Sequence, residues 1–257
     1  MRAFFIGLQF LTRINLVTQE NWTEEDFGKS VKFFPAIGAV LGIFFVSIIS
    51  GMIFFTGGVI LENFIGAIFF AADVFLTGGI HCDGLMDSAD GLFSGRDKEK
   101  MLEIMKDSRA GAFGVVSLVV IATLQISTVA DLISLSIMQT LAAIYCAPII
   151  GRFLMVAVIK KFPYARPQGI GKSFAKFSSE KTLSFAFVET LILFLPLLFF
   201  SKHFFLQAFF ALVITSIFAM YFGNFATKKL GGVTGDIYGA TEILSETLVP
   251  IIFLLLN

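Results

Sequence analysis

The sequence contains little charge and little cysteine. Charged residues make up 15% of its 257 positions, and 19 Lys and Arg residues balance 19 Asp and Glu residues to a formal net charge of zero. Soluble domains contain roughly 25% charged residues, and nucleic-acid-binding domains carry a basic excess. Two cysteines provide neither a disulfide framework nor the spacing of a cysteine metal site. These absences exclude a disulfide-rich scaffold and a partner recognised through bulk charge, such as nucleic acid.

Hydrophobic side chains take the place of the missing charge. They make up 56% of the chain, phenylalanine alone accounts for 33 positions, and the mean hydropathy is +0.87. A soluble fold of this length has too little interior to bury so much apolar surface, and disordered chains are poor in hydrophobic and aromatic residues. The composition therefore indicates a polytopic membrane protein.

Seven stretches of the chain are long and apolar enough to cross a bilayer, which takes about 20 residues of helix. Asp131 is expected to mark the turn between the third and the fourth. We expect an all-α bundle of about seven transmembrane helices that forms one domain over residues 1–257. The first expected span lies between Lys32 and Glu62, and the others are 60–80, 110–130, 132–151, 183–201, 203–227 and 237–256.

The N-terminal segment 1–30 contains an apolar run of only about ten residues, too short to span, so we expect a helix in the membrane interface. A cytoplasmic N-terminus then places every Lys and Arg except Arg152 and Lys202 on the cytoplasmic side, as the positive-inside rule requires. The cytoplasmic loops 81–109, 159–182 and 227–236 are the expected location of any chemistry.

The loop 81–109 is the most charged part of the chain, with 12 charged residues among 29. Asp83, Asp87 and Asp90 follow an i, i+4, i+7 pattern, which places their carboxylates within about 60° of one another on a helix. Like charges on one face repel and favour a compensating cation. Oxygen ligands suit Mg²⁺, which binds through carboxylates and substrate phosphates, so the triplet predicts a magnesium site. The alternative is a solvated polar loop.

The end of the same loop adds cations and a further acid. Lys106 and Arg109 are candidates to hold phosphate oxygens, and Asp107 is a candidate general base. His81 is the second candidate for acid–base catalysis, because imidazole titrates near neutral pH; a hydrogen-bonded structural histidine is the equal alternative. Acids for a metal together with cations for phosphate indicate phosphoryl transfer.

The segment that opens the last expected span is rich in glycine. Bare backbone at a helix N-terminus binds anions, so Gly235 and Asp236 are candidate substrate contacts, with a helix N-cap as the alternative for Asp236. Glu242 and Glu246 lie one turn apart and deeper in the same span. Acids within a membrane span are functional candidates, and these two are expected to pair with Arg152 or to support the site.

Several motifs resemble one known family. The segments TGGIHCDGLMDSADG (77–91) and MLEIMKDSRAGAFG (101–114) are similar to the signature of the cobalamin synthase family, the adenosylcobinamide-GDP ribazoletransferases. The family's other motifs follow in the expected order, with a departure at Asn15, where a proline is expected. They are LQFLTR (8–13), FFPAIGAVLG (33–42), YARPQGIG (164–171) and GGVTGDIYGATEILSE (231–246).

The resemblance implies a late step of cobalamin biosynthesis in the cell inner membrane. The substrates would be adenosylcobinamide-GDP and α-ribazole or its 5′-phosphate, the product adenosylcobalamin or its phosphate, the leaving group GMP and the cofactor Mg²⁺. It also implies that Arg166, within YARP, contacts a phosphate or the guanine nucleotide. A homo-oligomer is compatible with these features.

Two other functions fit parts of the pattern. A CDP-alcohol-type phosphotransferase of lipid headgroups also uses clustered aspartates and Mg²⁺, but its motif has Ala-Arg after the first pair of Asp residues, where this chain has Ser88-Ala89-Asp90. A seven-helix transporter would need polar residues near the membrane midplane, whereas the charges here concentrate in the loops.

Overall fold

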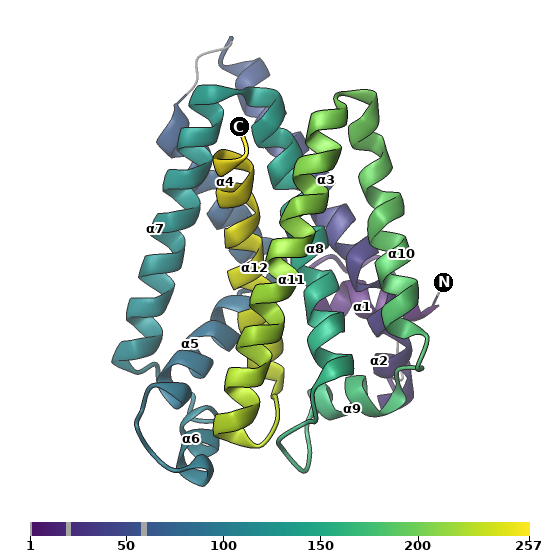
Figure 1. Ribbon diagram of the computed structural model, residues 1–257, viewed down its shortest axis with the longest axis vertical. Coiled ribbons are helices and arrows are strands. Elements are labelled where there is room, and N and C mark those ends of the chain that lie inside the picture. Colours follow the sequence, from purple (N-terminus) through teal and green to yellow (C-terminus); the bar gives the residue numbers. More distant parts are fainter. Residues whose placement is uncertain (1, 19–21, 58–60) are drawn as a thin grey trace.

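The protein is an all-helical bundle in a computed structural model that describes residues 2–18, 22–57 and 61–257 (Figure 1). Within these ranges there is no β-strand, and an isolated bridge joins Tyr164 to Val233. The helices are α1 (Arg2–Leu11), α2 (Glu24–Ser30), η1 (Val31–Phe33), α3 (Phe34–Phe55), α4 (Glu62–Thr77), α5 (Ile80–Leu92), α6 (Lys98–Ile104), α7 (Ala112–Leu135), α8 (Ile137–Lys161), α9 (Ile170–Phe177), α10 (Thr182–Phe194), η2 (Leu195–Phe199), α11 (Lys202–Leu230) and α12 (Gly235–Leu255).

The expected membrane class is confirmed. Six helices in the described part of the chain are long and apolar enough to span a bilayer, and a seventh span results if the bent pair α4–α5 is counted as one. The segment 1–30 begins with the short helix α1. The structure does not describe residues 1 and 19–21 of this segment, nor residue 60 of the expected span 60–80.

Two expected boundaries were wrong. Asp131 lies within α7, and the turn comes at Ser136, whose hydroxyl caps α8 by accepting from the Gln139 N–H. The expected span 60–80 ends early, because α4 stops at Thr77 and the chain bends by 93° into α5. Gly78 and Gly79, with φ of 68° and 73°, form this bend, a conformation that glycine adopts without steric cost.

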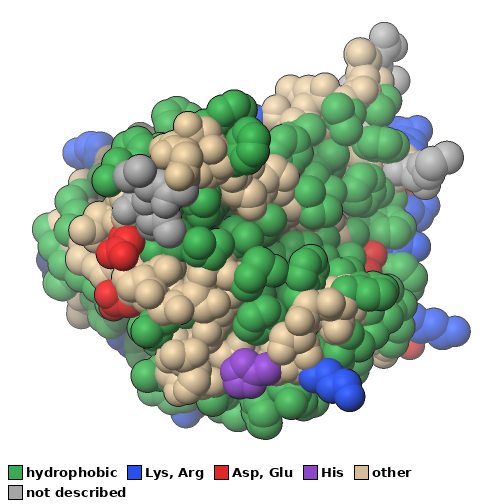
Figure 2. All heavy atoms as spheres, turned by 90° about the horizontal axis from the view of Figure 1, so that it is seen from above, with side chains coloured by type: hydrophobic (Ala, Val, Ile, Leu, Met, Phe, Trp, Pro, Cys, Tyr) green, Lys and Arg blue, Asp and Glu red, His purple; other side chains and the backbone are tan. Residues whose placement is uncertain are grey.

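The helix α8 forms the centre of the bundle and is buried along nearly its whole length. By contrast, α7, α10 and α11 expose rows of large hydrophobic side chains, including Val116, Val188 and Ile217. Such all-round apolar helices are typical of a membrane protein, in which lipid covers the outer face. Figure 2 shows the end of the bundle that lies at the top of Figure 1. This end is covered mainly by hydrophobic side chains.

The short helices α5, α6 and α9 lie at the other end of the bundle, where α8 and α11 end and α7 and α12 begin (Figure 1). The crossing of α5 and α12 is close: a Cβ at Gly84 would lie 2.8 Å from the Asp236 carbonyl oxygen and 3.1 Å from Gly239 Cα. Small residues allow such backbone contact between helices. This crossing brings the acidic helix α5 against the start of α12.

Candidate active site

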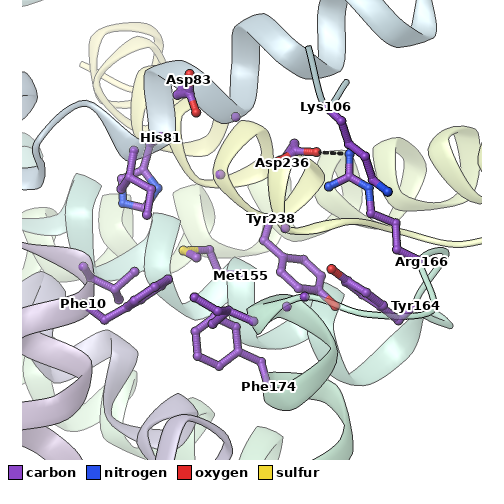
Figure 3. Close-up of a pocket in the computed structure, with 18 of the residues that line it drawn as sticks. Phe10, His81, Asp83, Lys106, Met155, Tyr164, Arg166, Phe174, Asp236 and Tyr238 are labelled. Atoms are coloured by element: carbon purple, nitrogen blue, oxygen red, sulfur yellow. Dashed lines mark ion pairs between the residues drawn. The ribbon is translucent and has the colours of Figure 1, made fainter. Parts of the chain in front are cut away.

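A cavity of about 360 Å³ lies where α5, α12 and the loop between α8 and α9 meet (Figure 3). It contains five of the sequence-predicted site residues on its polar side, and His81 also lines it. The five are Asp83, Lys106, Arg166, Gly235 and Asp236. Segments that are about 150 residues apart in the sequence therefore form one site, with carboxylates and cations facing the same space.

The helix α5 presents its three aspartates differently. The predicted helical arrangement is present, since Asp83, Asp87 and Asp90 all lie within α5. Asp83 is exposed and lines the cavity, whereas Asp87 is half-buried. Asp87 lies within electrostatic range of Asp83, Asp236 and Arg166. The first two aspartates of the triplet thus belong to the charged group around the cavity.

Asp90 binds the backbone at the start of α7. Its Oδ2 accepts from the Gly111 N–H at 2.7 Å, and its Oδ1 accepts from the Gly114 N–H at 2.9 Å. A Cβ at either glycine would lie within about 2.5 Å of a carboxylate oxygen, so bare backbone is required for this contact. An acid here also complements the positive end of the helix dipole. The structure therefore gives Asp90 a capping role in addition to its predicted one as a ligand.

Replacing Asp90 with Ala is expected to lower the free energy of unfolding by about 1 kcal/mol, the usual cost of losing a helix cap. Asp90→Asn keeps an oxygen acceptor and should recover part of that loss. Denaturant titration of the detergent-solubilised protein measures both variants. Equal stability of Asp90→Ala and the unmodified protein would contradict the capping role.

The loop between α8 and α9 is held against the start of α12 by backbone hydrogen bonds. The Ala165 N–H donates to the Val233 carbonyl and the Val233 N–H to the Pro163 carbonyl, each at 2.8 Å. This pairing places Arg166 beside Asp236, with Nη2 2.7 Å from Oδ2 and side chains that are 13% and 20% exposed. The N-cap of α12 is Thr234, which accepts from the Ile237 N–H. Asp236 therefore does not cap the helix, and its side chain faces the cavity.

Asp107 and Arg109 lie outside the cavity lining and bind each other at the surface. Their side chains are 39% and 87% exposed, and Arg109 Nη2 lies 2.6 Å from Asp107 Oδ2. Hydrogen bonds from Arg109 lower the pKa of Asp107 to about 2, which makes its carboxylate a weak base at neutral pH. Their assignments as base and phosphate ligand stay predictions, and Lys106 is the residue of this segment that reaches the cavity.

Behind the cavity lies a buried charged cluster. Arg152 on α8 is fully buried and its Nη1 lies 2.6 Å from Glu242 Oε1 and 3.3 Å from Glu246 Oε2, so the expected pairing with Arg152 is present. Both ring nitrogens of His81 face this cluster: Nε2 is 3.4 Å from Arg152 Nη2, and Nδ1 is 3.8 Å from Glu242 Oε2. His81 thus joins the cavity wall to the cluster, and its role in acid–base catalysis stays a prediction.

The sequence did not identify the aromatic side of the cavity. Phe10, Met155, Tyr164, Phe174 and Tyr238 line it, and they come from four helices and a loop. Among 33 phenylalanines, nothing in the spacing distinguishes Phe10 or Phe174. Phe10, Tyr164 and Tyr238 lie within motifs that the sequence analysis quoted, at 8–13, 164–171 and 231–246, but no role was assigned to any of the three.

Comparison with known proteins identifies the family of the chain. The family profile described as cobalamin-5-phosphate synthase matches residues 3–254. A protein of Desulfitobacterium hafniense named adenosylcobinamide-GDP ribazoletransferase is 38% identical over 96% of this chain and 94% of its own length. Proteins with the same name from Fusobacterium nucleatum and Desulforamulus reducens are 35% and 39% identical, covering 100% and 90% of this chain and 98% and 88% of their own lengths. No solved structure matches the chain. With a match across nearly its whole length, the chain belongs to the cobalamin-5-phosphate synthase family.

Proposed function

We propose that the protein is an adenosylcobinamide-GDP ribazoletransferase, a transferase of cobalamin biosynthesis. The observation that carries this is the polar side of the cavity, where two carboxylates face two cations in one space. A reaction at a pyrophosphate needs cations for its oxygens and acids for a metal ion. Family membership and the names of the relatives support the same activity.

The proposed reaction joins two substrates at one phosphorus. A hydroxyl of the ribose of α-ribazole, or of its 5′-phosphate, attacks the phosphorus that bears the cobinamide arm. A new P–O bond forms, and the bond to the GMP oxygen breaks with its electron pair. Arg166 and Lys106 hold phosphate oxygens, and the hydroxyl proton passes to a base at the cavity wall, for which His81 is the predicted candidate that lines the cavity. Gly235, at the start of α12, contributes backbone to the anion-binding side.

We propose Mg²⁺ as the cofactor, bound by Asp83 and Asp87 on α5, with Asp90 as the third predicted ligand. The described residues contain no group of three or more acidic, His or Cys side chains that could hold a metal ion by itself. Water and substrate phosphates would therefore have to complete the shell of the ion, as they usually do for Mg²⁺ bound by one or two carboxylates. Bound there, the ion would neutralise charge on the pyrophosphate and the leaving GMP.

We propose that the protein resides in the inner membrane with its N-terminus and the cavity on the cytoplasmic side. The distribution of Lys and Arg supports this orientation, because the cavity is lined by Lys106 and Arg166, which lie in two of the basic loops assigned to the cytoplasmic side. A cytoplasmic cavity gives soluble nucleotide substrates access from the compartment that contains them.

The assay for this function is GMP release from membranes that contain the protein. We expect release that requires adenosylcobinamide-GDP, α-ribazole and Mg²⁺ together and stops with EDTA. Membranes lacking the protein are the control. Release of CMP from a CDP-alcohol instead would point to the lipid-headgroup reaction, and solute uptake into vesicles without GMP release would point to a transporter; either would overturn the proposal.

A further inference from the structure

The cavity has two chemically different sides. Figure 3 shows Asp83, Asp236, Lys106 and Arg166 on one side, and Phe10, Phe174, Tyr164 and Tyr238 gathered on the other. A volume of about 360 Å³ lies at the lower end of the range for pockets that hold drug-sized molecules. The cavity therefore fits a nucleoside and a phosphate, while a macrocycle of corrin size stays outside.

The aromatic side is built from rings in two pairs. Phe10 and Phe174 lie edge to face with centroids 5.3 Å apart, and Tyr164 and Tyr238 lie 6.3 Å apart with an interplanar angle of 37°. Met155 of α8 lies between the two pairs in Figure 3. Planar aromatic rings and a polarisable thioether form good contacts with a flat heteroaromatic base.

The ring of Tyr164 lies close against two glycines. A Cβ at Gly171 would lie 2.8 Å from Tyr164 Cε2, and a Cβ at Gly169 would lie 3.0 Å from the tyrosine oxygen. Gly169 also has a φ of 127°, which favours glycine. Any larger residue would displace the ring, so the loop is shaped around the position of Tyr164.

Tyr238 supplies a polar atom without a partner. Its side chain is 1% exposed, and its hydroxyl has no hydrogen-bond partner among the described residues. Buried hydroxyls are usually hydrogen-bonded, because leaving one unsatisfied is costly. An unpaired hydroxyl among the aromatic rings indicates a ligand with a matching acceptor.

We propose that the aromatic side of the cavity is the subsite of the acceptor nucleoside and holds its benzo-fused bicyclic base. This inference rests on the proposed function. In the bound state the Tyr238 hydroxyl donates a hydrogen bond to the ring nitrogen that the glycosidic bond leaves free. Guanine fits this side less well, since its N–H edge needs acceptors such as carboxylates, and the carboxylates of the lining, Asp83 and Asp236, belong to the polar side.

The test compares two nucleosides in equilibrium binding to the detergent-solubilised protein, without the second substrate. One is a benzimidazole riboside, and the other is the indole riboside, which has carbon in place of the free ring nitrogen. The unmodified protein should bind the benzimidazole riboside about 3- to 10-fold more tightly, the effect of one hydrogen bond. Tyr238→Phe should remove this preference and leave indole riboside binding unchanged. Tyr221→Phe, on the exposed face of α11, is the matched control.

A second variant separates the ring contacts from the hydrogen bond. Phe10→Ala should weaken both ribosides by the same factor of about 5 to 100, because base stacking does not depend on the ring nitrogen. Neither variant should raise the KM for adenosylcobinamide-GDP more than about twofold. The subsite would be overturned if Tyr238→Phe still preferred the benzimidazole riboside over the indole riboside. It would also be overturned if the two variants raised only the KM for adenosylcobinamide-GDP. Riboside binding that depends on Tyr238 in a protein that releases no GMP would refute the proposed function and leave the subsite standing.

Discussion

Replacing Asp83 or Asp87 with Asn is expected to reduce the rate of GMP release at least about 100-fold. Each substitution keeps the shape of the side chain and removes a charge from the group around the cavity. A metal ion that stabilises transition-state charge contributes several kcal/mol, and each 1.4 kcal/mol corresponds to about tenfold in rate. Because Asp83 is exposed and Asp87 only half-buried, both variants should insert and purify normally.

The measurement is GMP release at increasing Mg²⁺, and a variant that has lost a ligand should require more of the ion for half-maximal rate. Asp97→Asn is the matched control: Asp97 caps α6 by accepting from the Lys100 N–H, and Asn caps a helix as well as Asp does. The control should release GMP at the normal rate. Near-normal turnover of Asp83→Asn and Asp87→Asn would refute the metal assignment.

Replacing Arg152 with Met is expected to destabilise the bundle by about 3–5 kcal/mol, the cost of leaving buried charges without their partner. Arg152 contacts both Glu242 and Glu246, and its Nη1 also donates to the Pro148 carbonyl at 3.2 Å. Asp73, 1% exposed, lies within electrostatic range of the same arginine. Without the guanidinium, three carboxyl groups would remain in the interior with no cation among them.

Thermal unfolding in detergent measures this effect, together with the yield of protein in the membrane. The double variant Arg152→Met, Glu242→Gln should recover part of the lost stability, because removing both partners leaves less unpaired charge. Arg96→Met is the control, since Arg96 is exposed between α5 and α6 and such surface changes usually cost less than about 0.5 kcal/mol. An unchanged melting temperature for Arg152→Met would contradict the structural role of the cluster.

The pairing of Glu242 and Glu246 with Arg152 was predictable because few basic residues were available as partners within the membrane spans. Two acids one turn apart must share a helix face, and a charge within a membrane span needs a partner. Arg152 was one of only two basic residues that the orientation left outside the cytoplasmic loops. The helical arrangement of Asp83, Asp87 and Asp90 followed from spacing in the same way.

Other features depend on contacts between distant segments, and no local pattern encodes them. Asp90 shares the helical face of Asp83 in sequence terms, yet it meets the start of α7 and binds its backbone. Asp107 lies beside Lys106 in the chain, but the turn before α7 directs it to the surface and leaves Lys106 at the cavity. The aromatic side unites Phe10 with Tyr238, which are separated by most of the chain.

The sequence by itself determined the class of this protein, its approximate spans, the helix that carries the aspartates and the family signature. These features follow from hydropathy and helical periodicity, which are properties of short stretches of chain. The tertiary structure alone decided where the span 60–80 bends, which aspartates reach the cavity, and that an aromatic side faces the charged one. Those outcomes depend on the close crossing of α5 and α12 and on the pairing of the 163–165 loop with Val233, because only packing between distant segments determines which side chains share a space.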